Sequence, residues 1–309
     1  MKISDMISQQ AEAVFSRAVS CLPTRLAVPL THLSSELPSR AGRLTATRGW
    51  GRMVREVEQE LQRRTPDLSE NNDTLLRQAL VASLALSVPK RLEREDLPES
   101  VLALIPKRLD RLADHFSSGG ADTYGSTDDF YLKDLKFVLL LSLPCGSNDV
   151  DLISRVPFSS AIMSVLRSGD MAGPFRYLAN GGFGVWFRLH TDTRNLGQFN
   201  ERGVDECFQR VADLLIRRKR VRGLTRTSWF VDPRLEQISP HLGYLQRNPT
   251  SRGAFLLRHS SHQVDIAWAL QKSKKRRRLY EAGRYKPVSY SFLWPRKALL
   301  SWAAEQRRA

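Results

Sequence analysis

The sequence predicts a mixed protein of the α+β or α/β class, with a helical domain followed by an α/β domain that has a mixed central sheet of about five or more strands. Apolar residues recur at helical spacing up to about residue 116, and short β-like runs alternate with amphipathic helices after residue 129. Between them, residues 117–129 (SSGGADTYGSTDD) have the composition of a linker or an exposed loop. We therefore expect a helical domain over residues 1–125 and a basic α/β domain over residues 126–309.

Three helices are predicted in the first domain, each from apolar residues that fall on one side at helical spacing. Asp73 is a suitable cap for the second helix, and Pro98 suits the first turn of the third. The apolar stripes are Met53, Val57 and Leu61; Leu76, Leu80, Leu84 and Leu86; and Val101, Ile105, Leu109 and Leu112.

In the second domain, apolar runs predict strands, and amphipathic segments between them predict helices. The predicted strands are Phe137–Leu143, Val185–His190, Gly223–Phe230, Ala254–His259 and Val288–Trp294. A helix is expected where Val204, Phe208, Val211 and Leu215 share a face. Further helices are expected over Pro240–Leu245, with Ser239 as its cap, and from about Val264 through Lys275.

Positive charge is concentrated in the last third of the chain. Residues 217–309 carry 22 Lys and Arg against 5 Asp and Glu, a net charge of +17, whereas the rest carries 26 against 27. A charge excess confined to one region attracts anions to that region. The expected partner is therefore acidic or phosphorylated: coenzyme A, an acyl carrier protein or a nucleic acid.

Several functional classes are excluded by composition. Cys21, Cys145 and Cys207 lie too far apart for a disulfide framework or a zinc site, which favours reduced thiols and a cytoplasmic location. The longest apolar run is far short of the roughly 20 residues that cross a bilayer, so no membrane span is expected. His259 and His262 have no neighbouring carboxylate or thiol, and no metal site is predicted.

The segment Trp186–Arg194 (WFRLHTDTR) carries the densest set of ionisable side chains in an apolar context. On a strand, Arg188, His190, Asp192 and Arg194 project from one face, because alternate residues share a face. Such a row forms either a salt-bridged network at the exposed end of the strand or a site. In the second case His190 exchanges a proton, Asp192 orients it, and the arginines hold an anion.

Residues 185–245 resemble the central part of the GNAT N-acyltransferases, in which a loop of the pattern Arg/Gln-x-x-Gly-x-Gly/Ala follows a strand. Arg194 and Gly197 match the first and fourth positions, and Phe199 departs from the sixth. The resemblance implies that Arg194, Asn195 and Gly197 hold the pyrophosphate of coenzyme A at the start of the next helix. It implies acyl-CoA or an acyl carrier protein as the donor substrate, with no tightly bound cofactor.

The same resemblance implies a role for Tyr244, which lies on the helix after the next strand: to protonate the departing thiolate. The other interpretation is that Tyr244 lies at the edge of the core. Ser228 and Asp232 follow a predicted central strand, at the end where α/β layers bind ligands, so Ser228 is a further catalytic candidate. No Gly-x-Ser-x-Gly sequence supports a serine hydrolase, and Asp232 equally suits a turn cap before Pro233.

A basic run extends from Lys272 to Arg278, with six charges in seven positions. Such a density attracts phosphates in a salt-dependent way, which makes Arg276, Arg277 and Arg278 candidates for contact with the donor. The alternative interpretation is a solvated helix end. The residues that could stack on bases are Tyr280, Tyr285, Tyr290 and Trp268, whereas Trp186, Trp229, Trp294 and Trp302 have the context of core residues.

The sequence therefore supports two functions of different classes. The first is transfer of an acyl group from acyl-CoA or acyl carrier protein to an amine or hydroxyl acceptor. The alternative is binding of single-stranded nucleic acid or RNA by the basic third, although no recognised nucleic-acid motif is present.

Overall fold

A computed structural model describes residues 2–19, 27–44, 47–64, 70–117, 124–260 and 262–308. The chain divides into two compact units. The first comprises Met1–Cys145 with Asp151–Ile153, and the second comprises Gly146–Val150 with Ser154–Ala309. The division thus falls after Cys145, later than the glycine- and serine-rich segment had indicated, because one further helix and a short strand belong with the first unit.

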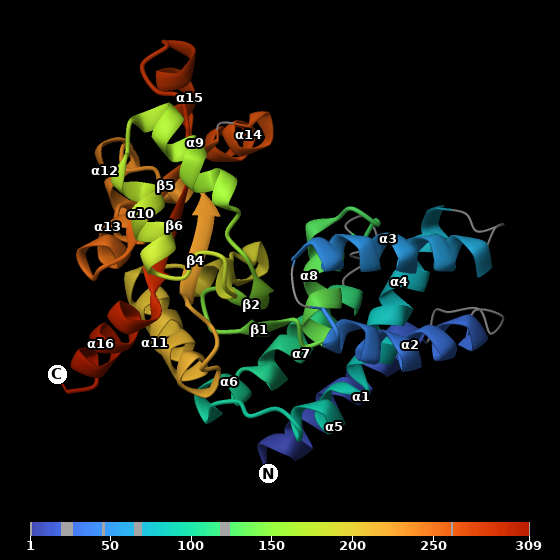
Figure 1. The fold of residues 1–309 in the computed structure, drawn as a ribbon. Helices are drawn as coiled ribbons and strands as arrows, with labels where there is room; N and C mark the ends of the chain where they lie inside the picture. The colour runs from blue at the N-terminus through green and yellow to red at the C-terminus, as the bar shows by residue number, and fades with distance from the viewer. Residues whose placement is uncertain are drawn as a thin grey trace. The chain divides into compact units, whose positions relative to one another are not determined.

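The first unit is helical up to Val138 in its described part (Figure 1). Its helices are α1 (Ile3–Val19), α2 (Ala27–Gly42), α3 (Thr47–Arg64), α4 (Glu70–Ala85), α5 (Val88–Leu92), α6 (Glu99–Leu102), α7 (Ile105–Ser117) and α8 (Asp129–Val138). The residues of the three predicted stripes lie on helices and are buried, with one exception: Leu86 lies just beyond the end of α4 and is 40% exposed. The third predicted helix is two, since α6 ends at Leu102 and α7 begins at Ile105.

The segment 137–143 was predicted as a strand, and this is wrong. Phe137 and Val138 end α8, Leu140 takes a left-handed conformation with φ of 55°, and only Ser142–Pro144 forms strand β1. The helix begins at Asp129 with an acidic first turn, and its apolar face continues into the apolar run. The run is apolar because its residues are buried, and its apolar character does not indicate which secondary structure it forms.

Six strands are present in the described residues, in the sheet order β1-β2-β3-β4-β6-β5. They are β1, β2 (Asp149–Ser154), β3 (Trp186–His190), β4 (Gly223–Ser228), β5 (Phe255–Ser260) and β6 (Ser289–Pro295). β4 pairs with β3 in parallel and with β6 in antiparallel orientation, so the sheet is mixed and the predicted fold class is confirmed. β2 was not predicted, because its sequence DVDLIS is half polar.

Helices of the second unit cover both faces of its strands. They are α9 (Phe158–Ser168), α10 (Ala172–Ala179), α11 (Glu201–Arg217), α12 (Leu235–Ile238), α13 (Tyr244–Ser251), α14 (Gln263–Gln271), α15 (Lys274–Glu281) and α16 (Arg296–Gln306), with 3-10 turns η3 (Thr193–Gln198), η4 (Trp229–Val231) and η5 (Pro240–Leu242). Two predictions are corrected by these bounds. The helix expected over Pro240–Leu245 is η5 followed by α13, and the one expected through Lys275 is broken at Ser273, which caps α15.

The two faces have separate cores. On one face, Ala161 of α9 and Tyr177 of α10 cluster with Trp186 of β3. On the other face, Phe208 of α11 packs edge-on against Trp294 of β6, with ring centroids 5.2 Å apart. Packing on both faces holds the strand ends in fixed positions. The tryptophans at positions 186, 229, 294 and 302 are all buried, as predicted.

Candidate functional site

The parallel strands β3 and β4 pair over a short length. Their register contains Phe187↔Leu224 and Arg188↔Thr225, whereas the other edge of β4 is paired with β6 as far as Ser228. In the described part of the chain, the carboxyl ends of β3 and β4 are therefore not joined by ladder hydrogen bonds. In α/β layers, ligands bind at the carboxyl ends of parallel strands.

The loop between β3 and α11 is held tightly. Asp192 caps η3 by accepting a hydrogen bond from the backbone N–H of Arg194 at 3.0 Å, and it pairs with the Arg194 guanidinium at 3.0 Å. Asn200 caps α11 by accepting from the backbone N–H of Gly203 at 3.0 Å. A Cβ at Gly203 would lie 2.1 Å from the carbonyl oxygen of Gln198, so the loop approaches the first turn of α11 as only glycine allows.

The predicted row of four polar residues on one strand is corrected by this loop. β3 ends at His190, and Asp192 and Arg194 lie at and in η3, because the Asp192 side chain captures the following backbone N–H. Arg188 donates to the carbonyl of Arg155 at 3.1 Å. His190 is half-buried at the end of β3, and alternation gives it the same face as Trp186, toward α9 and α10.

The other predicted residues of the loop differ in their surroundings. Gly197 is exposed and has open space where a Cβ would stand. The side chain of Asn195 lies outside the described residues, as does Cys21. The glycine at which loop and helix approach closely is Gly203, which the sequence analysis did not single out.

A buried arginine on β4, missed by the sequence analysis, occupies the region where β3 and β4 separate. The Arg226 side chain is on the α11 face, and the residue is 3% exposed. Its Nη2 donates to Oγ1 of Thr191 at 2.5 Å, which links it to the residue after β3. Its guanidinium carbon lies 5.5 Å and 5.3 Å from the ring centroids of Phe199 and Phe230. Burial lowers the pKa of Arg226 to about 10, which still leaves it charged at neutral pH.

The polar contacts continue behind Arg226. Thr191 Oγ1 donates to Oδ1 of Asn148 at 3.3 Å, and Asn148 Nδ2 lies 4.0 Å from the sulfur of Cys207. Burial raises the pKa of the Cys207 thiol to about 11, so the group is neutral and unsuited to act as a nucleophile. A charged residue in the middle of a predicted central strand was the available sequence signal for Arg226.

Tyr244 lies against the same loop. Its hydroxyl donates to the carbonyl oxygen of Phe199 at 3.2 Å, and the residue is 7% exposed. Burial is the main cause that raises the pKa of Tyr244; Arg226 opposes the shift and Glu201 adds to it. The structure thus gathers Tyr244, Arg226 and Phe199 on the α11 face, whereas His190 lies on the opposite face of the sheet.

Ser228 and Asp232 are both used as caps. Ser228 accepts from the backbone N–H of Phe230 at 3.2 Å. Asp232 accepts from the backbone N–H groups of Arg234 and Val288, at 3.0 Å and 3.3 Å, and burial raises the pKa of its carboxyl. These contacts support the capping interpretation of Asp232 and give Ser228 a structural role at the end of β4.

The basic run forms α15, and its arginines are not equivalent. Arg276 is 5% exposed, donates to the carbonyl of Ala269 and to Oγ of Ser239, and lies 4.8 Å from the ring centroid of Trp229. It therefore anchors α15 and does not present its guanidinium at the surface, contrary to the prediction. Arg277 is exposed but donates to the carbonyl of Gln271. The remaining exposed cations of the run are Lys272, Lys274, Lys275 and Arg278.

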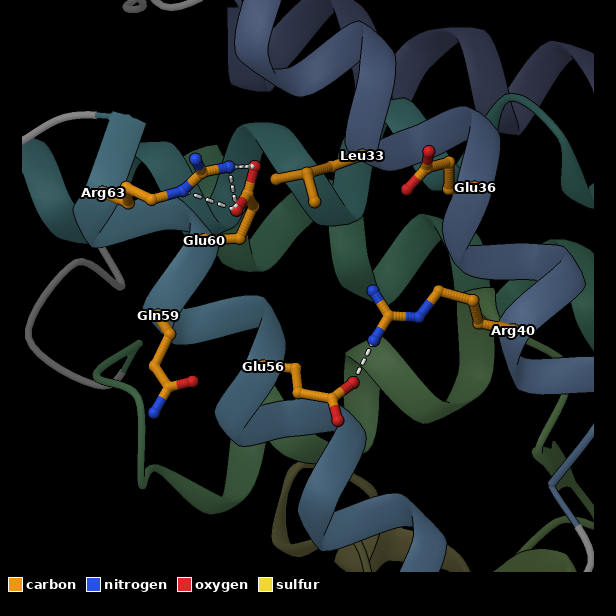
Figure 2. A pocket seen from close by; sticks show the side chains of 7 residues that line it. All are labelled: Leu33, Glu36, Arg40, Glu56, Gln59, Glu60 and Arg63. Atoms are coloured by element: carbon orange, nitrogen blue, oxygen red, sulfur yellow. Dashed lines mark hydrogen bonds and ion pairs between the residues drawn. The ribbon is translucent and has the colours of Figure 1, made fainter.

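A hollow of about 510 Å³ lies in the first unit between α2 and α3 (Figure 2). Its charged side chains pair across and along these helices: Arg40 contacts Glu56, and Arg63 contacts Glu60 at 2.6 Å. None of the predicted site residues lines it. Elsewhere, the described residues contain no cluster of ligands that could hold a metal, and none of their helices has the length and apolarity to cross a bilayer.

Solved structures provide the comparison with known proteins, since no family model and no curated protein matches the sequence. The chain is similar to an acyltransferase in complex with CoA and 10C-teicoplanin, with a TM-score of 0.50 and 12% identity, over 90% of this chain and 82% of that one. An acyltransferase with decanoyl-CoA and teicoplanin aligns at a TM-score of 0.47 and 13% identity, over 90% and 82%. One with decanoyl-CoA aligns at 0.46 and 14%, over 71% of this chain and 65% of that chain.

The likeness at a TM-score of 0.50 extends through both units, and it shows the fold. The chain therefore has an acyltransferase-like fold, built from a helical unit and a mixed sheet covered by helices.

Proposed function

We propose that this protein transfers an acyl group from acyl-CoA to an amine or hydroxyl acceptor, as a GNAT-like acyltransferase. The observation that carries the proposal is the parallel β3–β4 pair, whose hydrogen bonding stops after two residue pairs and whose loop leads directly into α11. The place where a parallel ladder ends, beside a loop that leads into a helix, is where α/β layers bind ligands, and the pantetheine arm would lie there. The acyltransferase-like fold supports the same assignment.

The donor's pyrophosphate would bind at the amino end of α11. The positive end of the helix dipole favours an anion there, together with the first-turn backbone N–H groups other than that of Gly203, which bonds to Asn200. Two arginines stand near this end: Arg202 is exposed, and Arg247 contacts Glu201 of the first turn at 4.0 Å. The net charge of +17 over residues 217–309 would attract the donor, and the same attraction would serve an acyl carrier protein.

The reaction divides between the two faces. An acceptor approaching from the α9 and α10 face loses its proton to His190 as its nitrogen or oxygen attacks the thioester carbon. The C–S bond then breaks, and the thiolate takes a proton from the Tyr244 hydroxyl. Since burial raises the pKa of Tyr244, the hydroxyl stays protonated at neutral pH and is able to donate.

Thermal unfolding with separate ligands tests this proposal. CoA, acetyl-CoA and octanoyl-CoA at a hundredfold excess over their Kd are expected to stabilise the protein by about 2.7 kcal/mol. A rise in Tm with single-stranded DNA alone, abolished by moderate salt, would refute the enzyme assignment.

Replacement of His190 by alanine is expected to leave the fold intact and to lower kcat about tenfold. A tenfold loss is smaller than the usual effect of removing a general base. His190 is only half-buried, so in the variant water can reach the acceptor and take its proton. The measurement is release of CoA with a panel of amines and alcohols, and the control is His241→Ala on the exposed η5 turn. Unchanged turnover in the His190 variant would remove it from the mechanism.

Nucleic-acid binding is the second candidate, favoured by one observation. Trp268 is 60% exposed on α14, close in sequence to the exposed cations of α15. An exposed indole beside lysines suits stacking and phosphate contact with a single strand. The tyrosines contribute less than predicted, since Tyr285 is 1% exposed. The DNA arm of the thermal experiment decides between the two functions.

A further inference from the structure

Arg226 is unusual because its charge is buried without a counterion. The structure shows no carboxylate in an ion pair with it among the described residues. Its contacts are one hydroxyl, that of Thr191, and the faces of two phenyl rings, those of Phe199 and Phe230. A buried cation is costly to maintain unless an anion compensates it, so such a group marks a ligand site.

The surroundings limit which anion can reach it. Arg226 lies on β4 beneath α11, one residue beyond the last residue of β4 that pairs with β3. It is therefore separate from the exposed loop where phosphates would bind. Phe199 and Phe230 contact each other, with ring centroids 5.5 Å apart, and both lie beside the guanidinium, so its surroundings are apolar and suit an anion carried on a short apolar chain. A carboxylate is the anion that a guanidinium binds through two parallel hydrogen bonds.

The guanidinium is also held in place. Its Nη2 is committed to Thr191, which in turn donates to Asn148, so the orientation is fixed while other donors of the group remain for a ligand. An arginine fixed in this way loses little side-chain entropy when it binds a carboxylate.

We propose that Arg226 is the receptor for a terminal carboxylate on the acyl group, so that the preferred donor is a dicarboxylic acyl-CoA of the succinyl class. The inference rests on the proposed acyl-CoA site and specifies its substrate class. The carboxylate would take the place of the missing counterion between the ends of β3 and β4.

The test compares succinyl-CoA with butyryl-CoA, which have the same chain length and differ in the terminal group, by isothermal titration calorimetry. The wild type is expected to bind succinyl-CoA about tenfold or more tightly, as a hydrogen-bonded charge pair implies. Arg226→Gln is expected to abolish that preference while binding of butyryl-CoA changes less than about threefold, and Arg226→Lys is expected to retain part of it. Arg308→Gln, at the exposed carboxyl end, is the matched control.

Each outcome decides the matter. Equal affinity of the wild type for both thioesters overturns this inference and leaves the acyltransferase proposal standing, whereas failure of CoA and both thioesters to bind overturns both. If Arg226→Gln does not fold, the comparison within the wild type still decides. If Arg226→Gln lost kcat equally with succinyl-CoA and butyryl-CoA, at unchanged affinity for both, Arg226 would stabilise the reacting carbonyl instead. That result would also overturn the carboxylate assignment.

Discussion

Replacing Tyr244 by phenylalanine is expected to lower kcat for acyl transfer by about 100-fold or more, with little change in KM for the donor. The substitution removes the proton that the proposed mechanism delivers to the CoA thiolate, and it preserves the buried ring. The pH dependence supplies a second readout. A general acid must be protonated to act, and burial raises the pKa of Tyr244, so the alkaline fall of the wild-type rate should lie above the usual pKa of a tyrosine. The variant should lack that fall.

The hydroxyl also donates to the carbonyl of Phe199, so the variant must be tested for displacement of the loop. Calorimetry with free CoA makes that separation: an unchanged Kd with reduced kcat assigns the effect to chemistry, and a weakened Kd assigns it to the loop. Tyr280→Phe on α15 makes the same chemical change at a residue outside the proposed site. Wild-type turnover in the Tyr244 variant would exclude it as the proton donor.

How much of the fold was predictable depended on how each segment is buried. β3, β4, β5 and β6 were found within one or two residues, because each contains apolar, aromatic or β-branched residues and lies between turn residues. β2 has polar residues at half of its positions and was missed. The apolar run at 137–143 was misassigned, since its residues fill the core both from the end of α8 and from β1. Periodicity does not distinguish these cases in a run of seven residues.

The candidate site was predictable to a smaller extent, because its contacts are not local in sequence. Tyr244 was named from the family resemblance, and its role stays a prediction, whereas Arg226 becomes conspicuous only when its neighbours Thr191 and Phe199 are in place. Arg276 has the composition of a phosphate ligand, yet its guanidinium is used against Trp229 and the carbonyl of Ala269. Charge in the sequence thus showed which region is basic, and burial decided which cations can meet a ligand.

Replacing Gly203 by alanine is expected to weaken CoA binding by about 10- to 100-fold and to lower the free energy of unfolding by about 1–3 kcal/mol. At an ordinary helical position, the change from glycine to alanine stabilises by about 0.5–1 kcal/mol. Here the added Cβ would stand 2.1 Å from the carbonyl oxygen of Gln198, and a backbone atom cannot yield as a flexible side chain can. The loop must therefore move away from α11, together with the Phe199 carbonyl that Tyr244 binds.

Gly197→Ala is the matched control, because it makes the same change in the same loop with nothing within 4 Å of the new Cβ. It is expected to alter stability by less than about 0.5 kcal/mol and to leave the Kd for CoA unchanged. Chemical denaturation and calorimetry measure the two quantities in each variant. A stabilised Gly203→Ala protein that binds CoA normally would contradict the close approach of loop and helix. If the variant is destabilised but binds CoA as the wild type does, the approach stands and the donor site must be sought elsewhere, because a loop that holds the pyrophosphate cannot be displaced without loss of affinity.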